Sequence, residues 1–210
     1  MASLGPTSPS ITTGALGVLG VVGGLGLLLA YAVDIPSSLN TLRLVLFCGG
    51  AIAIALATYG RHAAISRRLA RAGTIPLVAA NVWYIAWILL SLGDERPFAG
   101  DFGLVGFWAA LAFWLADAWF GVVALRLGVV WRWAALVLVA GSLMAITGID
   151  RLGFTSEADP TVFGPIALTG VALSGLAWII LGVQVAFLGT GRLGTGRLRP
   201  SSPAPVDGSG

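Results

Sequence analysis

Six long apolar runs, separated by short segments that hold most of the charge, constrain this chain more than any other feature. Crossing the hydrocarbon core of a bilayer takes about 20 apolar residues in a helix. Because no water is available there, a spanning backbone must satisfy its own hydrogen bonds, which favours helices for runs of this length. The sequence therefore predicts an all-α integral membrane protein, a bundle of six transmembrane helices at about Thr13–Val33, Leu39–Gly60, Ile75–Leu92, Phe102–Leu125, Val129–Gly148 and Val162–Leu188.

Composition supports the same class. Of 210 residues, 57% are hydrophobic and 10% are charged, and the mean hydropathy is +0.93. A water-soluble domain carries roughly 25% charged residues, so this chain has too little polar surface to cover a soluble core. We expect three parts: a disordered polar segment at residues 1–12, a transmembrane domain at 13–189 and a disordered, Pro/Ser/Gly-rich cytoplasmic tail at 190–210.

Charge alternates between successive connections. Arginines lie after the second run and the fourth run and in the tail, whereas acids dominate the other connections: Asp34, then Asp94, Glu95 and Asp101, then Asp150, Glu157 and Asp159. Because arginine-rich connections stay in the cytoplasm, the pattern predicts that both ends of the chain are cytoplasmic. The net charge of +3 is thus a topology signal, and we expect no binding of nucleic acid.

The first run leaves one alternative open. Ala30-Tyr31-Ala32 resembles a signal-peptidase site, and cleavage there would remove the first span. Against cleavage, no basic residue precedes Arg43 and the apolar run is longer than the roughly 7–15 residues of a signal peptide.

Glycines in the first run indicate close helix packing. Gly17, Gly20 and Gly24 lie at helical spacing and include a GxxxG pair. Small residues let helix backbones approach closely in membranes. They predict packing within the chain or, as an alternative, a homodimer interface.

Arginines also cluster between the second and third runs, within Arg61–Gly73. If this segment is helical, Ile65 and Leu69 share one face and the segment can lie on the inner leaflet. We expect its arginines to attract anionic lipid headgroups; the alternative is a topology signal without further role. The arginines are Arg61, Arg67, Arg68 and Arg71.

Asp117 is the sharpest candidate for function. It lies about 12 Å from the cytoplasmic end of the fourth run at 1.5 Å per residue. An acid at that depth is costly unless it is neutral or partnered, so it indicates a functional site. Asn81, Gln184, Arg132 and Tyr59 lie in the same half of the membrane and could form one polar cluster with it. The cluster is either a structural clamp or a transport or proton site.

The residue inventory excludes several kinds of chemistry. One histidine, His62, and one cysteine, Cys48, cannot build the usual haem, iron–sulfur or zinc sites, so we expect no cofactor and no metal. The sequence has no P-loop, HExxH or GxSxG motif, and no catalytic set is visible. Several of the eight tryptophans, such as Trp108, Trp131 and Trp133, fall where interfacial belts are expected.

Two stretches carry a resemblance. ALRLGVVWRWAALVLVAG (124–141) and GLAWIILGVQ (175–184) resemble uncharacterised multi-pass inner-membrane proteins of high-GC bacteria, especially actinobacteria. The resemblance implies a bacterial inner-membrane location and no activity. Three functions remain: an accessory or structural subunit with a membrane protein partner, favoured because no soluble domain is present; a small-solute or proton transporter using Asp117; and a membrane-embedded enzyme.

Overall fold

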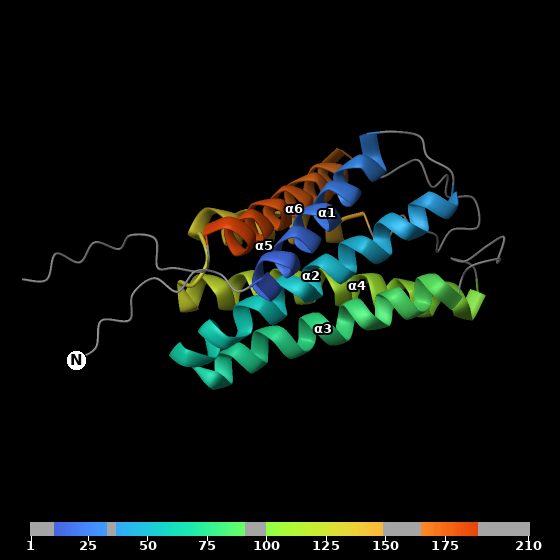
Figure 1. Cartoon of the computed structure of the whole chain (residues 1–210). Coiled ribbons are helices and arrows are strands. Elements are labelled where there is room, and N and C mark those ends of the chain that lie inside the picture. The colour runs from blue at the N-terminus through green and yellow to red at the C-terminus, as the bar shows by residue number, and fades with distance from the viewer. Residues whose placement is uncertain (1–10, 33–36, 91–99, 149–164, 189–210) are drawn as a thin grey trace, which may run out of the picture.

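The computed structural model describes residues 11–32, 37–90, 100–148 and 165–188 and is entirely helical within them, apart from short connections (Figure 1). The predicted tail at 190–210, and the N-terminal segment 1–12 up to residue 10, lie outside these residues. The all-α bundle of six helices is confirmed. The helices are α1 (Ile11–Ala32), α2 (Ser37–Ile65), α3 (Arg67–Leu90), α4 (Gly100–Leu127), α5 (Arg132–Ile146) and α6 (Pro165–Val183), which continues as the short π-helix η2 (Gln184–Leu188).

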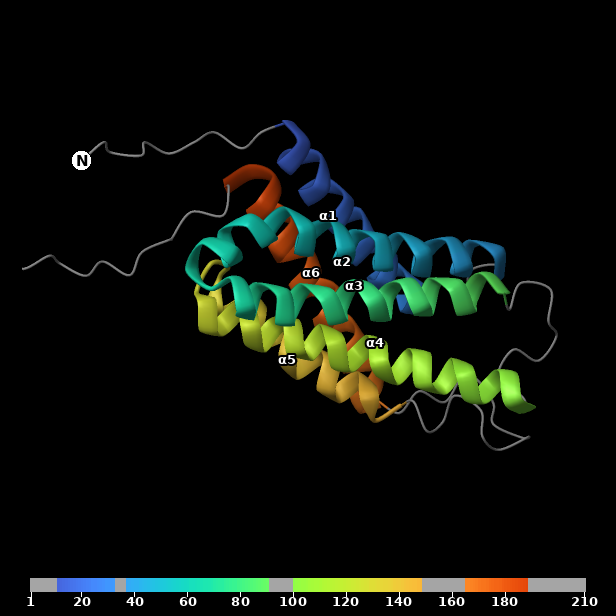
Figure 2. The same cartoon turned by 90° about the horizontal axis from the view of Figure 1, so that it is seen from below.

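The six helices form a closed ring. Each helix packs against the next along the chain, and α1 packs against α6, which closes the ring (Figures 1 and 2). The interior is filled by apolar side chains from every helix, among them Leu27, Phe47, Leu77, Phe113, Leu138 and Trp178.

The outer surface of the ring is apolar as well. Every helix exposes large hydrophobic side chains, for example Leu25, Leu56, Ile75, Leu115, Leu143 and Ile166. Exposing such a surface to water is unfavourable, whereas contact with lipid tails, which are also apolar, is not. Five helices (α1, α2, α3, α4 and α6) are long and apolar enough to cross a membrane. The chain is therefore a polytopic membrane protein.

α5 differs from the prediction for its run. The apolar run Val129–Gly148 predicted a full span, but α5 has only 15 residues and a length of about 22 Å. Gly128 adopts a left-handed conformation with φ 62°, and the chain does not become helical again until Arg132. At its other end the Thr147 hydroxyl donates to the Met144 carbonyl oxygen at 2.7 Å, within the last turn.

The connection between α2 and α3 also corrects the prediction. The expected ends at Gly60 and Ile75 are wrong, because α2 runs to Ile65 and α3 starts at Arg67. Alanine, leucine and arginine are strong helix formers, so the helices continue through the arginine-rich segment. Only Ser66 separates them, and its hydroxyl oxygen accepts from the Leu69 N–H at 3.4 Å, as an N-cap does. The four arginines are therefore divided between two helix ends instead of forming a separate helix on the leaflet.

The glycines of α1 face other helices of the same chain. A Cβ on Gly17 would meet the backbone of Ala186, and one on Gly24 would lie 2.7 Å from the Gly175 carbonyl oxygen. On the opposite side, a Cβ on Gly23 would lie 2.7 Å from the Leu46 carbonyl oxygen. A Cβ on Gly20 would meet the Ile54 side chain of α2. α1 thus fits between α2 and α6 because its glycines carry no side chain.

Gly17→Ala tests this fit. We expect the added methyl group to clash with the Ala186 backbone and to lower the free energy of unfolding by about 1–3 kcal/mol. Gly49→Ala in α2 is the matched control, since nothing lies within 4 Å of its Cβ position. That variant should be neutral or more stable by up to about 1 kcal/mol. Denaturant titration in mixed micelles, followed by circular dichroism, measures both, and equal effects would contradict the packing.

Candidate intramembrane site

Asp117 lies on the inner face of α4, inside the ring. Its side chain is fully buried, and ten residues separate it from the end of α4, about 15 Å along the helix. The Trp178 indole N–H on α6 donates to Asp117 Oδ2 at 3.0 Å. The Asn81 amide on α3 lies within interaction range of the same carboxyl group. Cys48 on α2 is near enough for the charge of Asp117 to act on its thiol. Four helices therefore contribute to the site.

Two acceptor oxygens of the site accept no well-formed hydrogen bond from the residues that the structure describes. Asp117 Oδ1 and Asn81 Oδ1 are both buried and without a partner. Asn81 Nδ2 donates to the Leu77 carbonyl oxygen at 2.9 Å. Buried polar atoms of this kind are rare in native proteins, and they point to a proton, a water molecule or an ion that supplies what the protein does not.

An aromatic row leads from this site toward the hairpin of α2 and α3. The Phe120 ring stacks on Trp178, with ring centroids 5.7 Å apart and planes at 20°. The His62 ring contacts the edge of Phe120 at 6.0 Å and 60°. His62 is fully buried, and neither of its ring nitrogens has a hydrogen-bond partner. The row therefore joins α2, α4 and α6 on the hairpin side of Asp117.

The predicted polar cluster is assembled only in part. Asn81 lies beside Asp117, but Gln184 uses its amide elsewhere: the Trp131 N–H donates to Gln184 Oε1 at 3.0 Å, and Gln184 Nε2 donates to the Val129 carbonyl oxygen at 3.4 Å. Gln184 thus ties η2 to the non-helical connection before α5. Arg132 is exposed at the start of α5, Tyr59 is half-buried on α2, and neither is among the groups that interact with Asp117.

Arginines mark the hairpin end of the bundle. Arg67, Arg68 and Arg71 are exposed on the first turns of α3, and Arg61 is half-buried at the end of α2. Nothing in the described structure opposes contact of these side chains with lipid headgroups, and that contact stays a prediction.

The sequence analysis missed Trp178, His62 and Cys48 as parts of this region. A signal for Trp178 exists, because an indole in the middle of an apolar run needs an acceptor for its N–H group when buried. His62 lies beyond Gly60, the predicted end of the second run, on the part of α2 that the prediction left out, and it is buried there.

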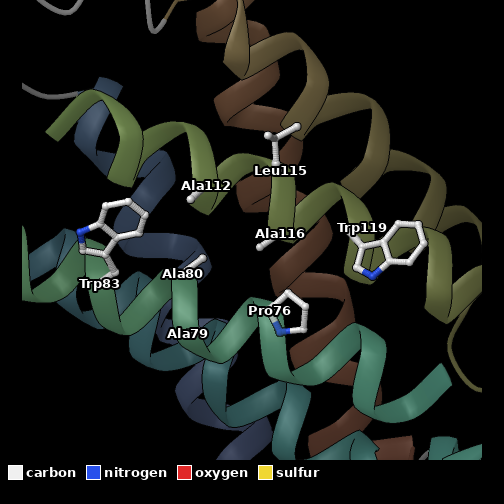
Figure 3. A pocket seen from close by; sticks show the side chains of 8 residues that line it. All are labelled: Pro76, Ala79, Ala80, Trp83, Ala112, Leu115, Ala116 and Trp119. Atoms are coloured by element: carbon white, nitrogen blue, oxygen red, sulfur yellow. The ribbon is translucent and has the colours of Figure 1, made fainter. Parts of the chain in front are cut away.

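A second feature is a shallow apolar groove of about 390 Å³ on the lipid-facing side of α3 and α4. Trp83 and Trp119 flank it, and small side chains form its floor (Figure 3). Pro76 in α3 has no N–H, which leaves the Ala72 carbonyl oxygen without its helical donor. The Trp119 indole N–H donates to that oxygen at 2.8 Å. The Trp119 side chain thus satisfies the carbonyl oxygen that Pro76 leaves free, and it also borders the groove.

A double-mutant cycle tests the hydrogen bond from the Trp119 indole to the Ala72 carbonyl oxygen. Trp119→Phe should lower the free energy of unfolding by about 1 kcal/mol, because the Ala72 carbonyl oxygen loses its donor. In a Pro76→Ala background the cost should shrink toward zero, since alanine supplies the backbone N–H that proline lacks. Denaturant titration of the four proteins in micelles gives the coupling. Equal costs in both backgrounds would show that the indole does not serve this carbonyl.

Comparison with known proteins finds no protein-family model that matches the chain, no similar curated protein and no similar solved structure. Within the described residues, no three His, Cys, Asp or Glu side chains are grouped as a metal site would require. The site at Asp117 is therefore interpreted from its own chemistry.

Proposed function

We propose that this protein crosses the inner membrane of a bacterium six times, with both ends in the cytoplasm, and that it binds and transfers a proton at Asp117. The observation that carries the proposal is a fully buried carboxyl group with one oxygen that accepts no well-formed hydrogen bond from the described residues. Intramembrane acids of this kind mark ion and proton pathways.

The surroundings of Asp117 favour a proton-binding role over a purely structural one. Its interacting groups, Trp178 and Asn81, are neutral hydrogen-bonding side chains that do not cancel the charge of a carboxylate. A buried carboxylate without a cationic partner is strongly disfavoured, and taking up a proton removes that cost. A bound metal cation is the weaker candidate, because hard cations need more oxygen ligands than the two free acceptors here.

The proposed orientation rests on the arginines. The α2–α3 hairpin, the end of α4 and the start of α5 lie at the same end of the bundle (Figures 1 and 2). This end carries six arginines: Arg61, Arg67, Arg68, Arg71, Arg126 and Arg132. The positive-inside rule then favours the cytoplasm for this end. A bacterial inner membrane is suggested by the resemblance of residues 124–141 and 175–184 to actinobacterial membrane proteins.

Topology reporters test the orientation. Fusions after Arg71, after Leu127 and at the carboxy terminus should report cytoplasm, and fusions after Arg96 and after Glu157 should report the opposite side. A non-cytoplasmic signal at the carboxy terminus would contradict the six-span arrangement, including a crossing by the short α5. The intact mass decides separately whether α1, whose glycines fit α2 and α6, stays on the mature chain.

Infrared spectroscopy of Asp117→Asn tests the proton site. In purified wild-type protein, a pH change should produce the carbonyl-stretch band of a buried protonated carboxyl group. The band should be absent in Asp117→Asn, which keeps the shape but cannot ionise. Asp101→Asn, the same change in the first turn of α4, is the control and should keep it. In proteoliposomes with an internal pH dye, Asp117→Asn should slow proton flux at least tenfold. A wild type without the band would favour the structural clamp.

The accessory-subunit interpretation is the second candidate, and the groove between α3 and α4 favours it. Its floor of Ala79, Ala80, Ala112 and Ala116 would let a transmembrane helix of a partner protein approach closely. The Asp117→Asn variant separates the two candidates. An accessory subunit carrying this change should still keep its stoichiometric partner in mild detergent. No observation on the described residues favours a membrane-embedded enzyme.

A further inference from the structure

We propose that a hydrated path runs through the hairpin half of the ring and connects Asp117 with the cytoplasmic end of the bundle by way of Thr74 and His62. The inference rests on the proposed function, since it names the side from which a proton reaches Asp117. It is carried by buried polar atoms that the protein itself does not satisfy.

Four side chains on three helices share this property. His62, Thr74, Asn81 and Asp117 are each at most 5% exposed, and each has at least one buried side-chain atom without a hydrogen-bond partner. A single such atom can be an exception, but several in one part of a bundle indicate internal water. Buried water typically forms about three hydrogen bonds to such groups.

The four side chains lie in order along the bundle axis. Ser66 marks the turn of the hairpin, and His62 precedes it by four residues, or about 6 Å along α2. Thr74 and Asn81 follow it along α3 by about 12 Å and about 22 Å. Thr58 on α2 is buried at the same height as Thr74, and its hydroxyl keeps acceptor capacity while it donates to the Ile54 carbonyl oxygen at 2.9 Å. The polar groups are thus spaced at intervals from the hairpin to Asp117, and water molecules would bridge these intervals in the proposed path.

Aromatic packing closes the other side of Asp117. Phe113 lies one turn nearer the start of α4 and is packed at the centre of an aromatic cluster. Its ring centroid is 5.7 Å from Phe47, 5.0 Å from Tyr84 and 4.7 Å from Trp114. These rings come from α2, α3 and α4 and pack against one another on that side of Asp117. Phe120 and Trp178 also stack on the hairpin side, but the unsatisfied polar atoms of His62 and Thr74 lie there too and favour access to Asp117 from the hairpin end.

The chemistry of these polar side chains suits proton transfer. A threonine hydroxyl both donates and accepts, and a neutral imidazole has one donor and one acceptor nitrogen. His62 can therefore pass a proton between water at the bundle end and water deeper inside. The other groups that face the path are neutral or weakly acidic: Phe120 beside His62, and Cys48, Asn81 and Trp178 around Asp117. Arg67, Arg68, Arg71, Arg126 and Arg132 are exposed around its cytoplasmic mouth, with Arg61 half-buried there.

Cysteine accessibility tests the path without a known substrate. In a Cys48→Ala background, Thr74→Cys is treated with a charged, membrane-impermeant methanethiosulfonate reagent from either side of sealed vesicles. Leu138→Cys is the matched control, because Leu138 is fully buried and lies six residues into α5, as Thr74 lies seven residues into α3. We expect Thr74→Cys to react at least tenfold faster than the control, and only from the hairpin side. Equal rates, or reaction from the opposite side, would overturn the path.

A second measurement tests the path if the Thr74→Cys variant fails to fold. Thr74→Val and His62→Phe remove the polar atoms at nearly constant shape and should slow hydrogen–deuterium exchange at the Asp117 carboxyl band at least tenfold, without removing the band. Exchange at the wild-type rate in both variants would overturn the path and leave the proton site standing. A wild type that lacks the band, with Thr74→Cys reactive, would instead overturn the proposed function and leave a water-filled pocket.

Discussion

A backbone that crosses lipid has no water to bond with, and the rest of this structure follows from that constraint. Regular helices satisfy it along most of the described residues, and at three departures from regular helix a side chain supplies a hydrogen bond to the backbone. The carbonyl oxygen freed by Pro76 accepts from Trp119, and the non-helical connection before α5 is held by Gln184. At the hairpin, Ser66 caps the start of α3. Three polar or amphipathic side chains that look unrelated in the sequence thus serve one requirement.

Helices whose backbone hydrogen bonds are satisfied still need a favourable interaction in order to associate. The hydrophobic effect does not provide it, because lipid tails are as apolar as the side chains of the helices. Close packing supplies it. α1 lies against α2 and α6 through its glycines, and a Cβ on Gly170 of α6 would lie 2.6 Å from the Gly141 carbonyl oxygen of α5. Such contacts fix the helices at short distances, and this explains how a ring with an apolar outer surface and an apolar interior keeps one arrangement.

Much of the fold could be predicted because hydropathy and length are local properties of the sequence. Each of the six predicted apolar runs contains one of the six helices or most of it. The errors occur where hydropathy does not decide: α2 and α3 extend through polar arginines because alanine and leucine keep the helix going, and α5 is shortened by a left-handed glycine beside its apolar run. The site was harder to predict. Asp117 and Asn81 have similar depth and lie side by side, whereas Gln184 has similar depth and a different neighbour. The direction in which a helix face points depends on packing that the sequence does not display.

The same packing would allow Asp117 to act both as a clamp and as the proposed proton site. The Trp178 N–H holds Asp117 Oδ2 and so fixes the carboxyl group in the ring, while Oδ1 is left without a protein partner. A purely structural acid would be expected to have both oxygens satisfied, since an unsatisfied buried acceptor weakens the clamp. Conversely, a proton site needs one oxygen held and one accessible. The division between the two oxygens, with the unsatisfied polar atoms of His62 and Thr74 on the hairpin side, is the arrangement that the proposed one-sided proton site would require.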